Sequence, residues 1–423
     1  MFSIDVTSHL LDNGLKVLFC RNPKLPLAVA NLWYRVGSAN DPAGKSGLAH
    51  LFEHMMFEGS ANVEKGQHFY IVQQAGGNCN ASTSTDRTNY YEKLPKQYLD
   101  TALWLEADRM GTFIQALNEE TLKNQIDVVT NERLERYDNQ PYGLAHEKLL
   151  HLLFTAPHPY ANPIIGTSEE IGKYSTEDLT EFFRAYYAPD NAALVVVGSF
   201  NETKTLNTIK KYFEAIPPYQ NGKRNTVTTA LPEHYAKEKY FEYTDNVELD
   251  KLYLAWHTKA VAYPESLGFD ILGDVLTGSK SAILTKTLTI DRQLAQSVSA
   301  SDRSGKYDGY FVITATAKPG VELDTLKSII LEELHNLRST NLEEALITRS
   351  RNALGSQFIY GLQNTGSMAD QINSYDFYFG EPNLFEKEYN MMKSFPTDDI
   401  HKLAVDFLDD SFCELRVLRR KNS

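Results

Sequence analysis

The chain of 423 residues is longer than one ordinary hydrophobic core supports, so its length indicates two domains of roughly 200 residues each. The hydrophobic fraction of 42% and the charged fraction of 23% are typical of a globular protein, and the formal net charge of -13 argues against a nucleic-acid partner. No apolar run reaches the roughly 20 residues that cross a bilayer, and the first residues lack a secretory signal pattern. We therefore expect no membrane span and a cytoplasmic location, or a periplasmic one if a signal peptide was removed.

Two strands open the chain and a helix follows them. Apolar residues alternate over 15–19, after the turn signal Asp12-Asn13-Gly14, and again over 28–36. Residues 38–46 interrupt that pattern, and the next helix is predicted to begin after Gly47 and to end near Gly59.

This helix carries a candidate metal site. His50 and His54 are four residues apart, so their rings point from one face of a helix and can bind the same ion, with Glu53 beside them as a base. Neutral imidazole suits zinc, but a catalytic zinc also requires a third protein ligand and an open position for water. The alternative is an amphipathic helix whose apolar residues face a core while its histidines lie at a solvent-exposed edge.

A second helix and a pair of strands come next. We predict the helix at 66–75, ended by Gly76-Gly77, and the strands at 78–85 and 88–95, where small, β-branched and aromatic residues predominate. The first of these strands is rich in Asn and Ser, which is typical of an edge strand. A long charged helix is predicted over 119–136.

The remaining signals divide the chain into domains. A helix capped by Ser175 or the residue after it precedes the all-apolar segment 194–197, which predicts a strand buried on both faces. Residues 217–235 lack apolar periodicity and are rich in Pro, Asn and Thr, which is typical of a linker. The sequence therefore predicts domains at 1–216 and 236–423.

Collinear matches between the two halves predict a duplicated fold. The segment 252–257 is similar to 31–36, and 269–279 aligns with 50–60. The second half lacks the metal motif, because its three equivalent positions hold Phe269, Leu272 and Gly273.

Together these features resemble the pitrilysin, insulinase and mitochondrial processing peptidase family of zinc peptidases (peptidase family M16), whose motif is the inverted His-x-x-Glu-His. The resemblance includes Gly47 to His54, Asn80-Ala81, Asn131-Glu132-Arg133 and the doubled architecture. It implies an M16B-like catalytic subunit with an α+β fold. The fold would comprise two homologous α/β-sandwich domains of the LuxS and processing-peptidase metallohydrolase type, each with a mixed, mostly antiparallel sheet flanked by helices.

The resemblance also implies a third zinc ligand. It assigns that role to Glu132, which follows His54 at the family's spacing. A carboxylate from a second helix would complete three ligands and leave a fourth position for water. Glu135, one turn along the same helix, is the alternative ligand. Processing peptidases carry another glutamate two turns before the ligand, where this chain has Gln125, whose amide is expected to orient a ligand by hydrogen bonding.

The implied activity is that of a zinc-dependent endopeptidase in which Glu53 acts on water as general base. The segment Asn80, Ala81, Ser82 and Thr83 resembles the family's edge strand, to which the substrate adds as an extra β-strand. The expected substrates are therefore unfolded peptides or extended segments. The alternative is an ordinary edge strand, kept polar against aggregation.

A partner subunit is also expected. Family members that complete the site from their second half carry an arginine and, shortly after it, a tyrosine, both of which bind the substrate backbone. Thr289 and Gln296 stand at those positions here. We expect a heterodimer with a homologous subunit that supplies this pair, with a homodimer as the alternative. The competing functions are a non-catalytic scaffold or peptide-binding subunit, and a zinc hydrolase acting on a non-peptide.

Overall fold

The computed structural model describes residues 4–220, 224, 227, 235–237, 239–262, 264–340 and 342–420. The chain divides into two compact units that are each drawn from separate segments. Unit 1 takes Met1–Arg133, Pro163–Val227 and Tyr360–Glu386, and unit 2 takes Leu134–Asn162, Thr228–Ile359 and Lys387–Ser423.

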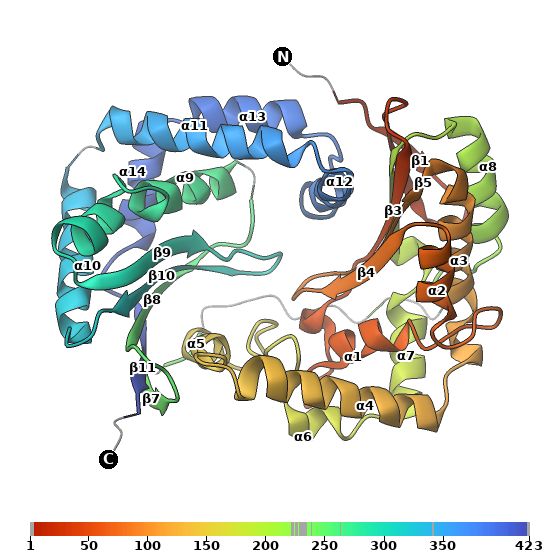
Figure 1. Ribbon diagram of the computed structural model, residues 1–423, viewed down its shortest axis with the longest axis horizontal. Coiled ribbons are helices and arrows are strands. Elements are labelled where there is room, and N and C mark those ends of the chain that lie inside the picture. Colours follow the sequence, from red (N-terminus) through yellow and green to blue (C-terminus); the bar gives the residue numbers. More distant parts are fainter. Residues whose placement is uncertain are drawn as a thin grey trace. The chain divides into compact units, whose positions relative to one another are not determined.

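Unit 1 is built on a mixed sheet (Figure 1), and its strand order is β1-β2-β6-β3-β5-β4. The strands are β1 (Thr7–Leu10), β2 (Lys16–Arg21), β3 (Leu27–Tyr34), β4 (Asn78–Thr83), β5 (Thr88–Pro95) and β6 (Ala192–Gly198). Only β2 and β6 pair in parallel. Every residue of β6 is buried, as its unbroken apolar run predicts, and β4 forms a free edge, with no further partner among the described strands.

Helices cover both faces of this sheet. Helix α12 lies on one face, against β3 and β6, whereas α3 and α8 lie on the other (Figure 1). The helices of the unit are α1 (Leu48–Met55), α2 (Gln67–Gln74), α3 (Leu99–Thr112), α4 (Glu119–Arg133), α6 (Ser168–Ile171), α7 (Thr176–Tyr186), α8 (Glu202–Phe213) and α12 (Thr365–Phe379). Ser175 caps α7 in a capping box with Asp178, which confirms the predicted helix start.

Unit 2 repeats this plan with the strand order β7-β11-β8-β10-β9. Its strands are β7 (Tyr240–Asp245), β8 (Lys251–Thr258), β9 (Ala295–Asp302), β10 (Gly309–Ala317) and β11 (Cys413–Arg419). Its helices are α5 (Ala145–Leu153), α9 (Glu265–Thr277), α10 (Leu323–Ser339), most of α11 (Glu344–Gly361), most of α13 (Phe385–Ser394) and α14 (Thr397–Phe407). An apolar core lies between the sheet and helices α9, α10 and α14, and α5 packs on the other face (Figure 1).

The five strands of the second sheet correspond to five of the six strands of the first, and β1 has no counterpart among the described strands. Strands β7, β11, β8, β10 and β9 correspond to β2, β6, β3, β5 and β4, and each sheet has one parallel pair at the equivalent place. This correspondence confirms the α+β class and the mixed, mostly antiparallel sheets flanked by helices. It also accounts for the weak sequence matches, because β3 and β8 are the central antiparallel strands in their sheets.

The two halves of the sequence exchange a helix. The segment that carries α5 belongs to the first half of the sequence but packs in unit 2, whereas the segment that carries α12 belongs to the second half and packs in unit 1. Helix α12 is held there by polar contacts: Asp376 pairs with Lys16 and with Arg35 at 2.9 Å, and Asn373 donates to the backbone oxygen of Asn31 at 3.0 Å. A sheet face of each unit is thus covered by a distant part of the chain.

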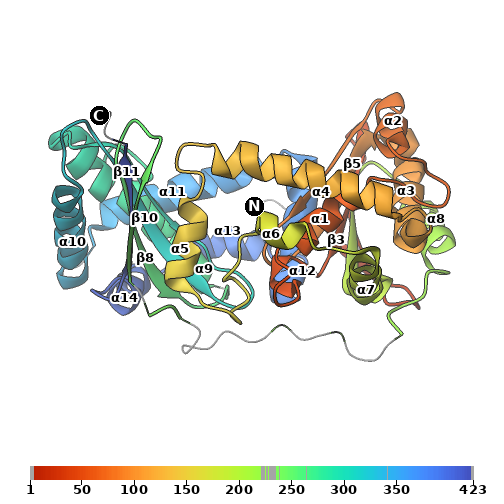
Figure 2. The same ribbon diagram turned by 90° about the horizontal axis from the view of Figure 1, so that it is seen from below.

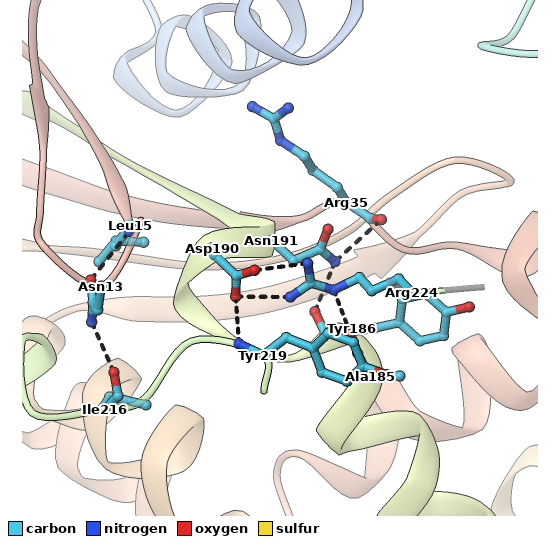
Figure 3. Close-up of polar contacts among 10 residues, drawn as sticks. All are labelled: Asn13, Leu15, Arg35, Ala185, Tyr186, Asp190, Asn191, Ile216, Tyr219 and Arg224. Carbon is cyan, nitrogen blue, oxygen red and sulfur yellow. Dashed lines mark hydrogen bonds and ion pairs between the residues drawn. The ribbon is translucent and has the colours of Figure 1, made fainter. Parts of the chain in front are cut away.

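The beginning of the predicted linker is tied to unit 1 (Figure 3). The guanidinium of Arg224 donates two hydrogen bonds of 2.8 Å to the Asp190 carboxylate, which also accepts from the Tyr219 backbone N–H at 2.9 Å. Asn13 holds the preceding turn by donating to the Ile216 oxygen at 3.0 Å. Residues 221–223, 225–226 and 228–234 of this predicted linker lie outside the described residues. The boundary at 217–235 stays a prediction.

Candidate metal centre

Helix α1 is amphipathic and fixed at its start. Its apolar face is buried, and Phe52 packs within 4.3 to 5.7 Å of the Phe113, Phe182 and Tyr187 rings, measured between centroids. The Asp41 carboxylate accepts hydrogen bonds from the Gly47 and Ala49 backbone N–H groups at 2.7 and 2.8 Å, so it performs the work of an N-cap. Burial raises the pKa of Asp41 to about 8, although these backbone donors act to lower it.

The loop before α1 is in close contact with the loop before α6. Gly47 and Gly166 both have positive φ, and a Cβ on Gly166 would lie 2.3 Å from the Ser46 oxygen. Ser46 is also held by Glu170, which accepts from its backbone N–H at 2.9 Å. Arg133, at the end of α4, donates to the Gly166 oxygen. One short loop therefore contacts both the start of α1 and the end of α4.

Three potential ligands converge on the exposed side of α1. His50 and His54 face Glu132 of α4, which lies alongside α1 (Figure 2). Glu132 Oε2 lies 3.3 Å from His54 Nε2 and 3.9 Å from His50 Nε2, and the potential ligand atoms of all three residues fall within 4.8 Å of one another. Ligand atoms at zinc's bond lengths of about 2.0–2.1 Å on a tetrahedron are about 3.4 Å apart, so this set fits a zinc ion.

Glu53 lies beside this set and contacts the edge strand. Thr83, the last residue of β4, donates its hydroxyl proton to Glu53 Oε2 at 2.5 Å. Burial raises the pKa of Glu53, whereas the Thr83 hydroxyl and the charges of His54 and Arg87 act to lower it. A bound dication would act in the same lowering direction.

The other two acidic or amide candidates lie outside the cluster. Glu135 falls in the π-helical turn Leu134–Asp138 that follows α4, and it is not part of the group of three. The Gln125 amide donates to Glu58 Oε1 at 2.8 Å, so it links α4 to the segment just after α1. Its predicted role toward a metal ligand stays a prediction.

The free edge of β4 presents a limited set of backbone groups. Ser84 N–H donates to the Arg87 oxygen at the hairpin end, so the alternation of an antiparallel pair directs the N–H and C=O of Cys79, Ala81 and Thr83 away from β5. The Ala81 N–H is covered by the side-chain oxygen of Asn80 at 2.9 Å. The side chain of Ser82 contacts Asn89 on the face opposite Glu53.

A second group of potential ligands, His68, Glu92 and Glu106, is buried beneath this hairpin. Arg109 binds Glu106 and lies 3.6 Å from Glu92, while His68 Nε2 lies 3.1 Å from Glu92 Oε1. Burial opposes ionisation of Arg109, but the two carboxylates raise its pKa. The guanidinium supplies the positive charge that a metal would otherwise provide, so this cluster is a buried ion-pair network.

Two family models and several curated relatives match this chain. The family Insulinase (Peptidase family M16) matches residues 16–168, and Peptidase M16 inactive domain matches 173–354. Zinc protease PqqE of Helicobacter pylori is 29% identical over 87% of this chain and 82% of its own length. Uncharacterized zinc protease YmxG of Bacillus subtilis is 22% identical over 96% of this chain and 97% of its own length.

Solved structures share the whole architecture. The crystal structure of a protease from Helicobacter pylori has a TM-score of 0.91 and 25% identity, covering 99% of this chain and 100% of that one. That of a putative M16-like peptidase from Alicyclobacillus acidocaldarius has a TM-score of 0.85 at 20% identity and 99% coverage of both chains, and shows the fold. The fold is therefore the two-domain α+β fold of the insulinase class. The chain itself belongs to peptidase family M16.

Two residues around the site had no signal in the sequence. Asp41 precedes α1 by too many residues to read as its cap, and Glu170, in α6, is distant in sequence from the Ser46 backbone that it binds. Asp41 lies outside the usual spacing for a cap because the intervening chain folds back on the helix start.

No helix in the described part of the chain is long and apolar enough to cross a membrane.

Proposed function

We propose that this chain is the metal-bearing subunit of a zinc endopeptidase, with His50, His54 and Glu132 as ligands. The observation that carries the proposal is the convergence of these three side chains beside Glu53, next to a free strand edge. When bound there, zinc would polarise a carbonyl group and acidify water. The names of the relatives as zinc proteases support the same metal.

The chain's own residues divide the remaining work. Glu53 accepts a proton from the attacking water and delivers it to the leaving amine, and such general acid-base catalysis contributes about 10² to 10⁴ in rate. The outward backbone groups of Cys79, Ala81 and Thr83 pair with an extended peptide, and the Asn80 side chain must release the Ala81 N–H for that pairing. Because backbone pairing selects shape, the proposed substrates are unfolded peptides or extended segments.

Two residues in the second half of the chain are the reason to propose a partner subunit. Thr289 lies in the π-helical turn Thr285–Asp291, where its hydroxyl donates to the backbone oxygen of Thr285, and Gln296 is exposed on β9. Neither side chain is a cation or a phenol that would bind a substrate backbone as the family's arginine and tyrosine do. We propose that a homologous subunit supplies that pair.

The test combines metal analysis with peptide hydrolysis. The purified chain, with one equivalent of zinc, is incubated with a library of unstructured peptides, alone and with a homologous metal-free subunit from the same source. The proposal predicts one bound zinc and cleavage that requires the second subunit. Full activity of a homodimer would reject the heterodimer, and zinc binding without cleavage in either arm would favour the non-catalytic alternative.

A further inference from the structure

Thr83 connects the proposed base to the free strand edge. Its hydroxyl lies 2.5 Å from Glu53 Oε2 and 3.4 Å from the hydroxyl of Thr88. Thr88 donates its own proton to the Val36 backbone oxygen at 2.9 Å. The single hydroxyl proton of Thr83 is therefore directed to the Glu53 carboxylate.

Glu53 has no other hydrogen-bond donor among the described residues. A glutamate side chain rotates about three bonds, so a carboxylate without a fixed contact samples several positions. Threonine is β-branched and has restricted χ1 rotation, especially within a strand. The bond thus anchors a flexible group to a stiff one through one carboxylate oxygen of Glu53.

The position of Thr83 in the strand adds a second consequence. Successive residues of a strand alternate, so Thr83 directs its side chain toward α1 while its backbone N–H and C=O face the open edge of β4. Thr83 would therefore contact both groups. Its backbone would pair with the bound peptide, and its side chain would bind the carboxylate of Glu53.

We propose that Thr83 is a positioning residue that fixes Glu53 relative to the bound peptide strand. This inference rests on the proposed peptidase function and extends it. Thr83 takes no proton from the substrate, and its contribution is the orientation of the carboxylate before reaction.

The test uses Thr83→Val, which keeps the shape of the side chain and removes the hydroxyl, beside Thr83→Ser, which keeps the hydroxyl. A hydrogen bond to a charged group of this kind corresponds to a loss of about 10- to 100-fold in kcat. KM and zinc affinity are expected to stay within about twofold of wild type, because neither backbone pairing nor the ligands change. Thr83→Ser should recover most of kcat. Thr180→Val is the matched control, because the hydroxyl that it removes contacts only the Thr176 oxygen on α7 among the described residues.

A spectroscopic measurement on the metal-free protein completes the test. Carbon-13 labelling of glutamate carboxyls, with Glu53→Gln used to assign the signal, should show a shift for Glu53 in Thr83→Val and none in Thr180→Val. An active wild type with an unchanged kcat in Thr83→Val, or an unmoved carboxyl signal, would overturn the role of Thr83 alone. A zinc-loaded wild type that cleaves no peptide, with or without a homologous subunit, would overturn the proposed function as well.

Discussion

The helices α1 and α9 occupy equivalent places in the two units, yet their hydrogen bonds to the edge strands run through different groups. In unit 1 the strand holds the helix, because Thr83 of β4 donates to the Glu53 carboxylate. In unit 2 the helix holds the strand, because Thr277 of α9 accepts the Ala300 N–H of β9 at 3.0 Å. Gly273 lets α9 approach β9 so closely that an added Cβ would lie 3.0 Å from the Ala300 oxygen.

The starts of these helices differ as well. Helix α1 begins at a buried carboxylate, Asp41, which accepts from its first backbone N–H groups, whereas α9 begins after Pro264 without a side-chain cap among the described residues. The equivalent helices of a duplicated fold can therefore have different roles in its two units. One copy is anchored and carries polar groups toward an open strand, and the other packs closely on its edge strand and accepts a backbone hydrogen bond from it.

The largest expected effect is at the base itself. Glu53→Gln should retain zinc and lower kcat by about 10² to 10⁴, because the amide cannot accept the proton from water. At the equivalent position of α9, Leu272→Met should leave kcat unchanged, since that side chain lies in an apolar core. Metal content and peptide hydrolysis are measured on both variants. An active Glu53→Gln protein would remove the functional distinction between the helices.

The second prediction concerns the ligand on α4. Glu132→Ala should weaken zinc binding by more than the ~100-fold typical of losing a group that only orients a ligand, and hydrolysis should be lost with the metal. Glu135→Ala, in the following π-helical turn, should bind zinc as wild type does. Competition with a chelator measures both affinities. The reverse ranking would make Glu135 the ligand.

The third prediction tests the anchor of α1 against a matched turn in unit 2. Gly166→Ala and Gly320→Ala both place a side chain at positive φ, which costs about 1–2 kcal/mol. Only Gly166 faces a close backbone oxygen, so its variant should lose about 1–3 kcal/mol more and should also bind zinc less tightly. Urea unfolding and zinc titration provide the readouts. Equal zinc affinity in the two variants would show that the loop contact does not position α1.

The smallest expected effect concerns a comparison of buried His68 with half-buried His257. His68 of unit 1 contacts Glu92, whereas neither ring nitrogen of His257, on β8, has a hydrogen-bond partner in the described part of the chain. Burial lowers the pKa of His257 from 6.5 to about 4. Between these pH values the unfolded chain binds a proton that the folded chain does not, so stability is present above pH 6.5 and falls as pH decreases through this window.

His257→Phe should reduce this acid destabilisation by at most about 1.4 kcal/mol per pH unit, because one titrating group is removed. The aromatic stack with Tyr235, whose centroid lies 3.7 Å from that of His257, can be retained by phenylalanine. Free energies of unfolding at pH 7 and pH 4.5 provide the measurement. An unchanged difference between the two pH values would show that His257 does not contribute to it.

Local signals predicted the elements around the site well. Gly47 and Gly76-Gly77 bracket α1 and α2, and the strands predicted over 78–85 and 88–95 are β4 and β5. Turn glycines and side-chain alternation depend on neighbouring residues, so they can be read from a short window. The ends of helices were less accurate, since α1 ends at Met55 and α4 at Arg133, where a π-helical turn takes over.

Contacts between distant segments could not be predicted in this way. The parallel pairing of β2 with β6 depends on long crossovers, and the hydrogen bond between Thr83 and Glu53 depends on how α1 lies over the hairpin. Thr83 was expected to contact substrate through its strand, and its side-chain role toward Glu53 became visible only in three dimensions. Spacing within one helix identified the two histidines, whereas their glutamate partner required the family resemblance.

The exchange of α5 and α12 has a consequence for synthesis on the ribosome. All strands of the first sheet have been synthesised once Gly198 is added, but α12, which covers one of its faces, ends at Phe379. The ion pairs of Lys16 and Arg35 with Asp376 therefore cannot form until residues near the other end of the chain have been synthesised. Such late closure of contacts between distant residues slows folding and leaves a sheet face uncovered in the growing chain. The nascent protein is thus expected to depend on chaperones until most of its length has been translated.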